Sequence, residues 1–188
     1  MKVSREQVAL NRERIIETAA RLFREKGYDG IGVADLMKSA GLTHGGFYGH
    51  FASKEELLAE AAAHALKKSV ERWEGYVAEG RDTALEKIGD GYLTAQHRDH
   101  PEKGCSVTAL GADVARLGPK ARRAMTDGAR GQLAVLEQLM PGADAAEQRR
   151  QALARYAAMI GAIVLSRAVD DEALSLDVLD AVRDQLTG

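Results

Sequence analysis

A short segment near the N-terminus gathers residue types that can bind nucleic acid. Between Thr43 and Lys54 the chain carries two histidines, a tyrosine and three glycines: His44, Gly45, Gly46, Tyr48, Gly49 and His50. Polar and basic side chains of these types can hydrogen-bond to phosphates and to base edges. Glycine lets a backbone approach a ligand closely. The segment therefore has the chemistry of a surface that could lie against DNA.

Three short apolar patterns predict the helices that would position this segment. Residues 11–26 repeat apolar side chains every three to four positions and are followed by Gly27. A second, shorter pattern over 33–40 is followed by Gly41, and a third consists of Phe47 and Phe51, four residues apart. Glycine is typical just after a helix, and this apolar spacing is typical of helices. Three short helices joined by tight turns predict a helix-turn-helix unit.

The third helix, treated as α-helical, predicts a role for each of its residues. At 100° per residue, the two phenylalanines face one side and the three glycines the other. Each glycine costs the helix about 1 kcal/mol relative to Ala, so its stability must come from burial of the phenylalanines, about 1.5–3 kcal/mol each. The Thr43 hydroxyl is expected to cap this helix, where exposed N–H groups can also meet a phosphate. His44 and Tyr48 are best placed to reach base edges, and Lys38 is a candidate contact from the second helix.

The rest of the chain is expected to be helical. A capping box at Ser53 predicts a helix to about residue 76, and another at Thr83 predicts one to about residue 96. Residues 97–104 are expected to form a loop, followed by helices over 105–116, 119–140, 145–169 and 175–186. No strand is predicted. The chain is therefore expected to be all-α with about nine helices, divided into a helix-turn-helix domain at 1–54 and a second helical domain at 55–188.

Composition and charge fit this division. The chain is 45% hydrophobic and 29% charged, which is ordinary for a globular protein with a core. Residues 1–54 carry a net charge of +3 and residues 55–188 a net charge of −5, which suits a phosphate-binding end, although scattered charge could also give so small a split. One cysteine excludes an intrachain disulfide. No apolar run approaches the roughly 20 residues of a membrane span, and the charged start lacks a signal core, so a cytoplasmic protein with no membrane partner is predicted.

The residues also resemble a known family. RIIETAARLF at 14–23, Gly27-Tyr28 and GLTHGGFYGHFASKEEL at 41–57 are similar to the N-terminal signature of TetR/AcrR-type bacterial transcriptional regulators. The resemblance implies a homodimer that binds a palindromic operator in double-stranded DNA, and release by a small-molecule effector of unknown identity. It implies that His50 and Lys54 bind the phosphate backbone. Family habit alone favours a repressor over an activator.

The chain departs from the family pattern at three places. Family members often have Ser or Thr where this chain has Gly32-Val33, a small polar residue at Gly46 and a larger residue at Gly49. These departures predict little direct base readout and a larger share of phosphate contacts and DNA shape.

The resemblance assigns a dimer interface to the last two helices. The apolar positions expected there are Tyr156, Ile160, Val164, Leu176, Leu179 and Val182. Periodicity alone fits an ordinary core helix equally well. The need for two recognition helices at two-fold spacing favours the dimer.

The resemblance also implies an effector pocket enclosed by the helices between 55 and 165, with ligand binding moving the fourth helix and with it the DNA-binding end. The residues expected to line it are Trp73, Tyr92, Cys105, Met125, Leu136, Tyr156 and Met159. Cys105 follows Gly104 at an expected helix start, so it has two interpretations: a thiol sensor of electrophiles or oxidants, or a small buried residue that opens a helix. His97, His100 and Cys105 have no fourth ligand nearby, so neither a metal nor another cofactor is predicted.

Two other classes of function are weaker alternatives. An enzyme is not predicted, because no glycine-rich phosphate loop, nucleophile elbow or paired catalytic carboxylates are present. A helical adaptor that binds no DNA would leave Lys54 and the glycines without a role.

Overall fold

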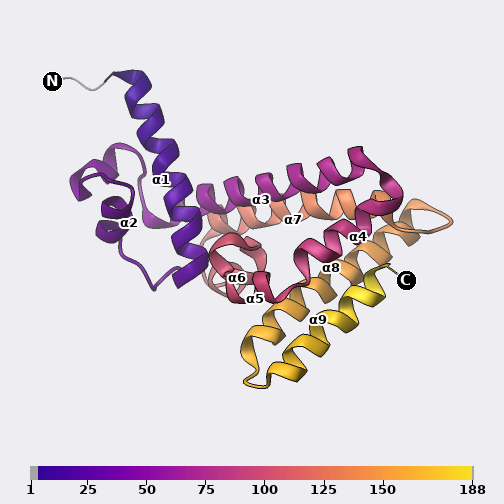
Figure 1. Ribbon diagram of the computed structural model, residues 1–188. Coiled ribbons are helices and arrows are strands. Elements are labelled where there is room, and N and C mark those ends of the chain that lie inside the picture. The colour runs from indigo at the N-terminus through magenta and orange to yellow at the C-terminus, as the bar shows by residue number, and fades with distance from the viewer. Residues whose placement is uncertain (1–3, 188) are drawn as a thin grey trace.

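The chain folds into helices only, as expected, over the part that the computed structural model describes, residues 4–187. Nine α-helices and two short 3-10 helices occur there (Figure 1), at α1 Arg5–Lys26, α2 Val33–Ser39, η1 His44–Gly49, α3 Lys54–Glu79, α4 Arg81–Tyr92, α5 Ala95–Asp99, η2 Pro101–Lys103, α6 Ser106–Val114, α7 Pro119–Leu139, α8 Ala145–Ala168 and α9 Glu172–Thr187. The prediction of an all-α fold with about nine helices is confirmed.

The N-terminal three helices form a small head at one end of the molecule (Figure 1). Helix α1 begins six residues before the expected position, because the Ser4 hydroxyl accepts the Gln7 N–H at 3.1 Å and caps it. It ends at Gly27, whose φ of 76° is a left-handed conformation that favours glycine. Gly41, with φ 69°, makes the tight turn after α2. The core of the head is closed by buried apolar side chains, including Ile15, Phe23, Leu36, Met37, Phe47 and Phe51.

Helix α3 connects this head to the body. The Ser53 hydroxyl accepts the Glu56 N–H at 3.1 Å, as the predicted capping box requires, and Glu56 Oε2 accepts at 2.7 Å the N–H of Ala52, the residue before the N-cap. The first turns of α3 bury Leu57 and Leu58 in the core of the head, and its later turns bury Leu66 and Trp73 in the core of the body. Helix α7 runs alongside most of it (Figure 1).

The segment after α3 differs from the sequence prediction. Thr83 does not cap a helix, since α4 begins at Arg81 and the Thr83 hydroxyl donates to the Gly80 carbonyl. The expected helix to residue 96 ends at Tyr92, and the expected loop over 97–104 contains the end of α5 and η2. The physical reason is a second cap, because the Thr94 hydroxyl accepts the His97 N–H at 3.1 Å and starts α5.

The last two helices pack against each other and complete the body (Figure 1). Asp144 caps α8 by accepting the Glu147 N–H at 2.8 Å, as predicted. Asp171 accepts the Leu174 N–H at 3.0 Å at the start of α9. Among the described residues, no helix combines the length and apolar character needed to cross a membrane.

Two neighbouring aromatic residues of η1 should respond very differently to truncation. Phe47 is 1% exposed and Tyr48 is 70% exposed. We expect Phe47→Ala to lower the free energy of unfolding by about 3–5 kcal/mol, because it leaves a cavity in the core of the head. Tyr48→Ala should change it by less than about 0.5 kcal/mol. Urea denaturation followed by circular dichroism measures both, and equal losses for the two variants would contradict the assigned packing.

Candidate nucleic-acid interface and ligand cavity

The recognition segment, His44–Gly49, is the 3-10 helix η1 and not the expected α-helix. The Gly46 N–H donates to the Thr43 carbonyl at 3.0 Å, which is the i to i+3 pattern of such a helix. Thr43 is the N-cap residue, but its hydroxyl makes no capping hydrogen bond, so the predicted side-chain cap is wrong. Only the backbone carbonyl of Thr43 bonds to η1, through the Gly46 N–H, and the Thr43 side chain remains exposed.

An aromatic pair forms the exposed face of η1. The rings of His44 and Tyr48 meet edge to face with their centroids 6.4 Å apart. The Tyr48 ring also lies edge-on to Phe47, with centroids 5.2 Å apart. Because Phe47 is buried, it supports a tyrosine that is otherwise open to solvent. Both residues expected to reach base edges therefore lie side by side on the surface.

Only two of the three glycines expected on the outward face of this helix lie there. A Cβ added at Gly45 or Gly49 would meet no atom within 4 Å, so both positions are open. A Cβ at Gly46 would lie 3.7 Å from the Met37 methyl group. Gly46 therefore faces α2, and its assignment to the outward strip is wrong.

The predicted phosphate-binding residues lie at the edge of the same surface. Lys54 is the first residue of α3, and its Nζ lies 4.4 Å from the centroid of the Tyr28 ring, a cation–π contact that orients the ammonium group. Sequence reasoning did not identify Tyr28 as part of the site, and its position directly after Gly27 was the available signal. His50 is half-buried, and its Nδ1 has no hydrogen-bond partner among the described residues. Lys38 is exposed in the last turn of α2.

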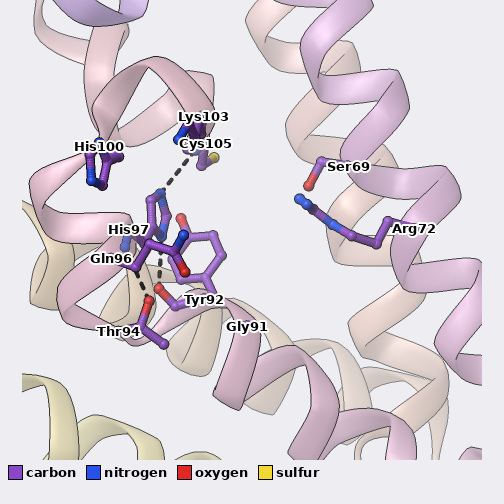
Figure 2. Close-up of a pocket in the computed structure, with 11 residues that line it drawn as sticks. Ser69, Arg72, Gly91, Tyr92, Thr94, Gln96, His97, His100, Lys103 and Cys105 are labelled. Carbon is purple, nitrogen blue, oxygen red and sulfur yellow. Dashed lines mark hydrogen bonds between the residues drawn. The ribbon is translucent and has the colours of Figure 1, made fainter.

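A cavity of about 210 Å³ opens in the body between α3 and the segment from α4 to α6 (Figure 2). It is lined by Ser69, Arg72, Gly91, Tyr92, Thr94, Gln96, His97, His100, Lys103, Gly104 and Cys105. Tyr92 and Cys105 were predicted to line an effector pocket. The other candidates, Trp73, Met125, Leu136, Tyr156 and Met159, pack in or against the hydrophobic core and do not line this cavity, so their contact with an effector stays a prediction. Apolar periodicity selected them because it reports burial, which core and pocket residues share.

His97 organises the wall of this cavity. Its Nδ1 lies 2.7 Å from the Tyr92 carbonyl, and its Nε2 accepts the Cys105 N–H at 3.0 Å, which fixes a neutral ring with the proton on Nδ1 (Figure 2). Burial lowers the pKa of His97 from its usual 6.5 to about 4, and the charges of Arg167, Arg72 and Arg24 act in the same direction against the hydrogen bond to Tyr92. A Cβ at Gly104 would overlap the imidazole, so the close approach requires glycine.

The position of the single cysteine is compatible with both interpretations of the sequence. Cys105 is the N-cap residue of α6 and is 6% exposed, as a small residue opening a helix would be. Its Sγ lies 3.9 Å from Gln132 Oε1. It also lines the cavity, so the sensor interpretation stays a prediction. Both ring nitrogens of His97 are engaged, and no group of three potential metal ligands is found among residues 4–187.

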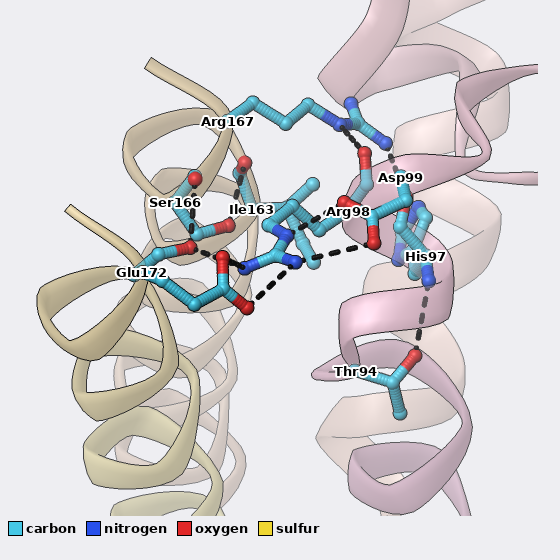
Figure 3. Close-up of polar contacts among 9 residues, drawn as sticks. Thr94, His97, Arg98, Asp99, Ile163, Ser166, Arg167 and Glu172 are labelled. Atoms are coloured by element: carbon cyan, nitrogen blue, oxygen red, sulfur yellow. Dashed lines mark hydrogen bonds and ion pairs between the residues drawn. The ribbon is translucent and has the colours of Figure 1, made fainter. Parts of the chain in front are cut away.

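Residues 95–104 are tied to both ends of the molecule. Arg98 forms an ion pair with Glu172 at 3.1 Å and donates to the Ser175 hydroxyl, both on α9. Arg167 of α8 donates to the carbonyls of His97 and Arg98 at 2.6 and 2.8 Å (Figure 3). On the other side, Arg24 of α1 donates twice to the Glu102 carbonyl, at 2.6 and 3.1 Å. One short segment therefore links the head to the last two helices.

The outer faces of α8 and α9 expose apolar side chains. Leu153, Val164, Leu165, Leu174 and Leu176 are each between 38% and 49% exposed. Val164 and Leu176 are thus accessible, as the predicted dimer interface requires, and Ile160 and Val182 are partly buried.

Two of the predicted interface residues face inward. Tyr156 and Leu179 are 6% and 1% exposed in their own chain. The Tyr156 hydroxyl donates to Gln132 Oε1 on α7 at 2.7 Å. Their assignment to the interface is therefore wrong, because both already pack in the core of the body.

The fold and the exposed recognition segment define a helix-turn-helix DNA-binding protein. The family model for "Bacterial regulatory proteins, tetR family" matches residues 15–61. The HTH-type transcriptional repressor NemR of Escherichia coli (strain K12) is 29% identical over 161 residues, which cover 80% of this chain and 81% of NemR.

Solved structures agree with this likeness. The crystal structure of the reduced form of E. coli NemR matches with a TM-score of 0.79 at 25% identity over 94% of each chain. Bacillus subtilis FadR in complex with stearoyl-CoA shares the fold, with a TM-score of 0.64 at 20% identity over 90% of this chain and 96% of that one. The N-terminal part of the chain therefore matches the TetR family of bacterial regulatory proteins, and the chain as a whole is similar to members of that family, which are transcriptional regulators and not enzymes.

The low pKa of His97 should make the folded protein less stable in mild acid. Below about pH 6.5 the unfolded chain protonates this imidazole, whereas the folded chain does so only near pH 4. The unfolded state then binds more protons, so we expect stability to fall progressively from about pH 6.5 toward pH 4, by at most about 1.4 kcal/mol per pH unit. Urea denaturation across this range should give a shallower pH dependence for His97→Gln. Identical dependences in the two proteins would contradict the burial of a neutral His97.

Proposed function

We propose that the protein is a cytoplasmic, homodimeric repressor that binds a palindromic operator and is released by a small-molecule effector. The observation that carries the DNA-binding part is the exposed pair of His44 and Tyr48 on a buried support, next to an oriented Lys54. The names of relatives such as the repressor NemR support repression over activation.

Each residue of the head has a proposed task in this complex. His44 and Tyr48 contact base edges, and the open backbone at Gly45 and Gly49 approaches the groove. Lys54, His50 and Lys38 contact phosphates, as does the exposed Thr43 hydroxyl. Residues 1–54 form the DNA-binding domain and residues 55–188 the effector-binding and dimerisation domain, joined by α3.

The effector is proposed to occupy the cavity beside His97. One wall of the cavity belongs to α3, which carries the head, and the other belongs to residues 92–105, which Arg98 and Arg167 hold to α8 and α9. A change in the spacing of these walls moves α3 and with it the head. A ligand that binds more tightly at one spacing therefore shifts the equilibrium between two head positions, by an amount set by the difference between its affinities for the two states. FadR, whose solved structure holds stearoyl-CoA, offers a precedent for a ligand in this fold.

The operator contacts predict two distinct effects of substitution. Lys54→Ala should weaken binding roughly tenfold at any DNA sequence and lower the salt dependence by about one unit of slope, because one phosphate contact is lost. Tyr48→Ala should weaken binding to the operator more than binding to random DNA. Mobility-shift titrations at a series of salt concentrations, with an operator fragment and with random DNA, measure both effects. Lys67→Ala, on the exposed surface of α3, is the control, and unchanged affinity for both test variants would refute the assignment.

The dimer prediction rests on the exposed apolar face of α8. Val164→Glu places a charge in the proposed interface and should dissociate the dimer at micromolar concentration, because a buried unpaired charge costs several kcal/mol. Light scattering coupled to size exclusion gives the mass. Arg130→Glu on the exposed face of α7 should leave the mass unchanged. A wild-type protein that is monomeric at all concentrations would disprove the proposed dimer.

A further inference from the structure

The cavity beside His97 adjoins a second one, and together they present an excess of positive charge. The second cavity, about 230 Å³, shares Ser69, Arg72, Lys103 and Gly104 with the first and extends toward α1. Besides the shared residues, it is lined by Glu17, Ala20, Arg24, His64, Ala65 and Lys68. Glu17 is the one acidic residue among the linings of the two cavities.

Two of the four cations in these walls are already used within the chain. The Lys68 ammonium lies 3.1 Å from Glu17 Oε1, and the Arg24 guanidinium donates to the Glu102 carbonyl. The side chains of Arg72 and Lys103 make no hydrogen bond or ion pair within residues 4–187. Figure 2 shows Ser69 and Arg72 extending from α3 toward the opposite wall, where Lys103 and Cys105 lie. The shared part of the two cavities therefore holds two cationic side chains that form no ion pair, although Glu102 adjoins Lys103 in the chain.

The charge of Arg72 acts on two neighbouring groups. Burial is the main reason why the pKa of Arg24 is lowered; Cys105 and Glu102 oppose this shift, and the nearby charge of Arg72 adds to it. The charge of Arg72 also contributes to the low pKa of His97, after burial. An anion between Arg72 and Lys103 would relieve this repulsion.

Neutral donors also line the site. The Ser69 hydroxyl accepts a hydrogen bond from Gln132 Nε2 at 3.0 Å, so its own proton remains available to donate. Tyr92 lines the first cavity, and its buried hydroxyl has only the Cys105 thiol, a weak hydrogen-bonding group, to interact with. A bound oxygen acceptor would satisfy this hydroxyl better.

We infer that these joined cavities bind a small organic oxyanion, with its carboxylate or phosphoryl group held between Arg72 and Lys103, and that this class of molecule is the effector. A guanidinium binds either group through two parallel hydrogen bonds, and such charge-assisted bonds are about twice as strong as neutral ones. A cationic ligand finds no free carboxylate here, since Glu17 is engaged by Lys68. The identity of the effector rests on the proposed function, whereas the binding of the anion does not.

Binding can be measured with the chain's own tryptophan. Trp73 is the single tryptophan, adjoins Arg72 in sequence and packs on Tyr92 with ring centroids 6.1 Å apart. The probes are benzoate and phenyl phosphate, with benzamide as the neutral isostere of benzoate and benzamidine as a cation. We expect saturable fluorescence changes with at least one anion, with at least tenfold tighter binding than benzamide and none with benzamidine. Which anion binds tighter identifies the carboxylate or the phosphoryl group as the preferred form.

A pair of matched variants locates the binding. Arg72→Gln should weaken anion binding at least tenfold, whereas Lys67→Gln, which removes an exposed cation of the same helix, should leave it within twofold. Equal binding of benzoate and benzamide, equal effects of the two variants, or no binding of either anion would overturn the inference.

An operator shift assay separates this inference from the proposed function. If the unliganded protein binds operator and the tighter anion weakens that binding in wild type but not in Arg72→Gln, the anion belongs to the effector class. If the anion binds but leaves operator affinity unchanged, its role as effector is overturned. If the unliganded protein binds no operator, the proposed function fails, while the fluorescence titration still decides whether the cavity takes an anion.

Discussion

Helix α3 is buried in two hydrophobic cores at once, and the position of the DNA-binding head depends on that shared helix. Leu57 and Leu58 belong to the core of the head, and Leu66 and Trp73 belong to the core of the body. The hydrogen bonds of an α-helix run without a break from one end to the other, and α3 contains no proline that would kink it. Movement of α3 against its neighbours in the body is therefore passed to the recognition segment with little loss.

Residues 95–104 form the wall of the cavity opposite α3. They have few apolar contacts of their own and are held by polar ones: Arg98 and Arg167 toward α8 and α9, Arg24 toward α1, and His97 between the Tyr92 carbonyl and the Cys105 N–H. Polar contacts are directional, so a segment held in this way has one defined position. The ligand cavity lies between this fixed segment and α3, where a bound molecule can act on the distance between them.

The sequence predicted the helices well where caps and apolar periodicity acted together. Ser53 and Asp144 begin their helices as their capping boxes indicated. Thr83 does not, because Gly80 ends one helix and is itself the N-cap of the next, which begins three residues earlier than the Thr83 cap predicted. The helix type of the recognition segment was harder to predict. This segment has only six residues, three of them glycines, and so short a pattern does not distinguish a 3-10 helix from an α-helix. Tyr156 and Leu179 were placed on the wrong face for a related reason. A helix that packs on the core with one face and exposes apolar residues on the other has apolar residues all round. Only the packed structure shows which of these residues are exposed.

The cavity could not be found from the sequence, because its walls come from residues far apart in the chain and of ordinary type. Arg72 and Lys103 lie 31 positions apart, each within a pattern that fits a solvated surface. What brings them together is the packing of α3 against the segment that His97 organises. In the sequence His97 fits only an incomplete metal-ligand pattern, and nothing there connects it to Gly104, whose lack of a side chain makes the close approach of the imidazole possible.

The contacts between head and body divide into a weak polar set and a strong apolar set, and this division decides what a ligand can do. The Lys120–Glu56 pair spans 3.0 Å between side chains that are 68% and 27% exposed, and such pairs contribute about 0–1 kcal/mol. The bonds from Arg24 to the Glu102 carbonyl contribute about 1.5–3 kcal/mol. Shifting a two-state protein from 1:99 to 99:1 takes a difference in binding free energy of about 5.5 kcal/mol, which a few charge-assisted bonds at Arg72 and Lys103 can supply. The buried contacts of Phe23, Leu58 and Leu110 are worth more than any such ligand provides. A ligand in the cavity is therefore expected to break the polar contacts and to move the head and α3 together with the residues of α6 that share their core, leaving that core intact.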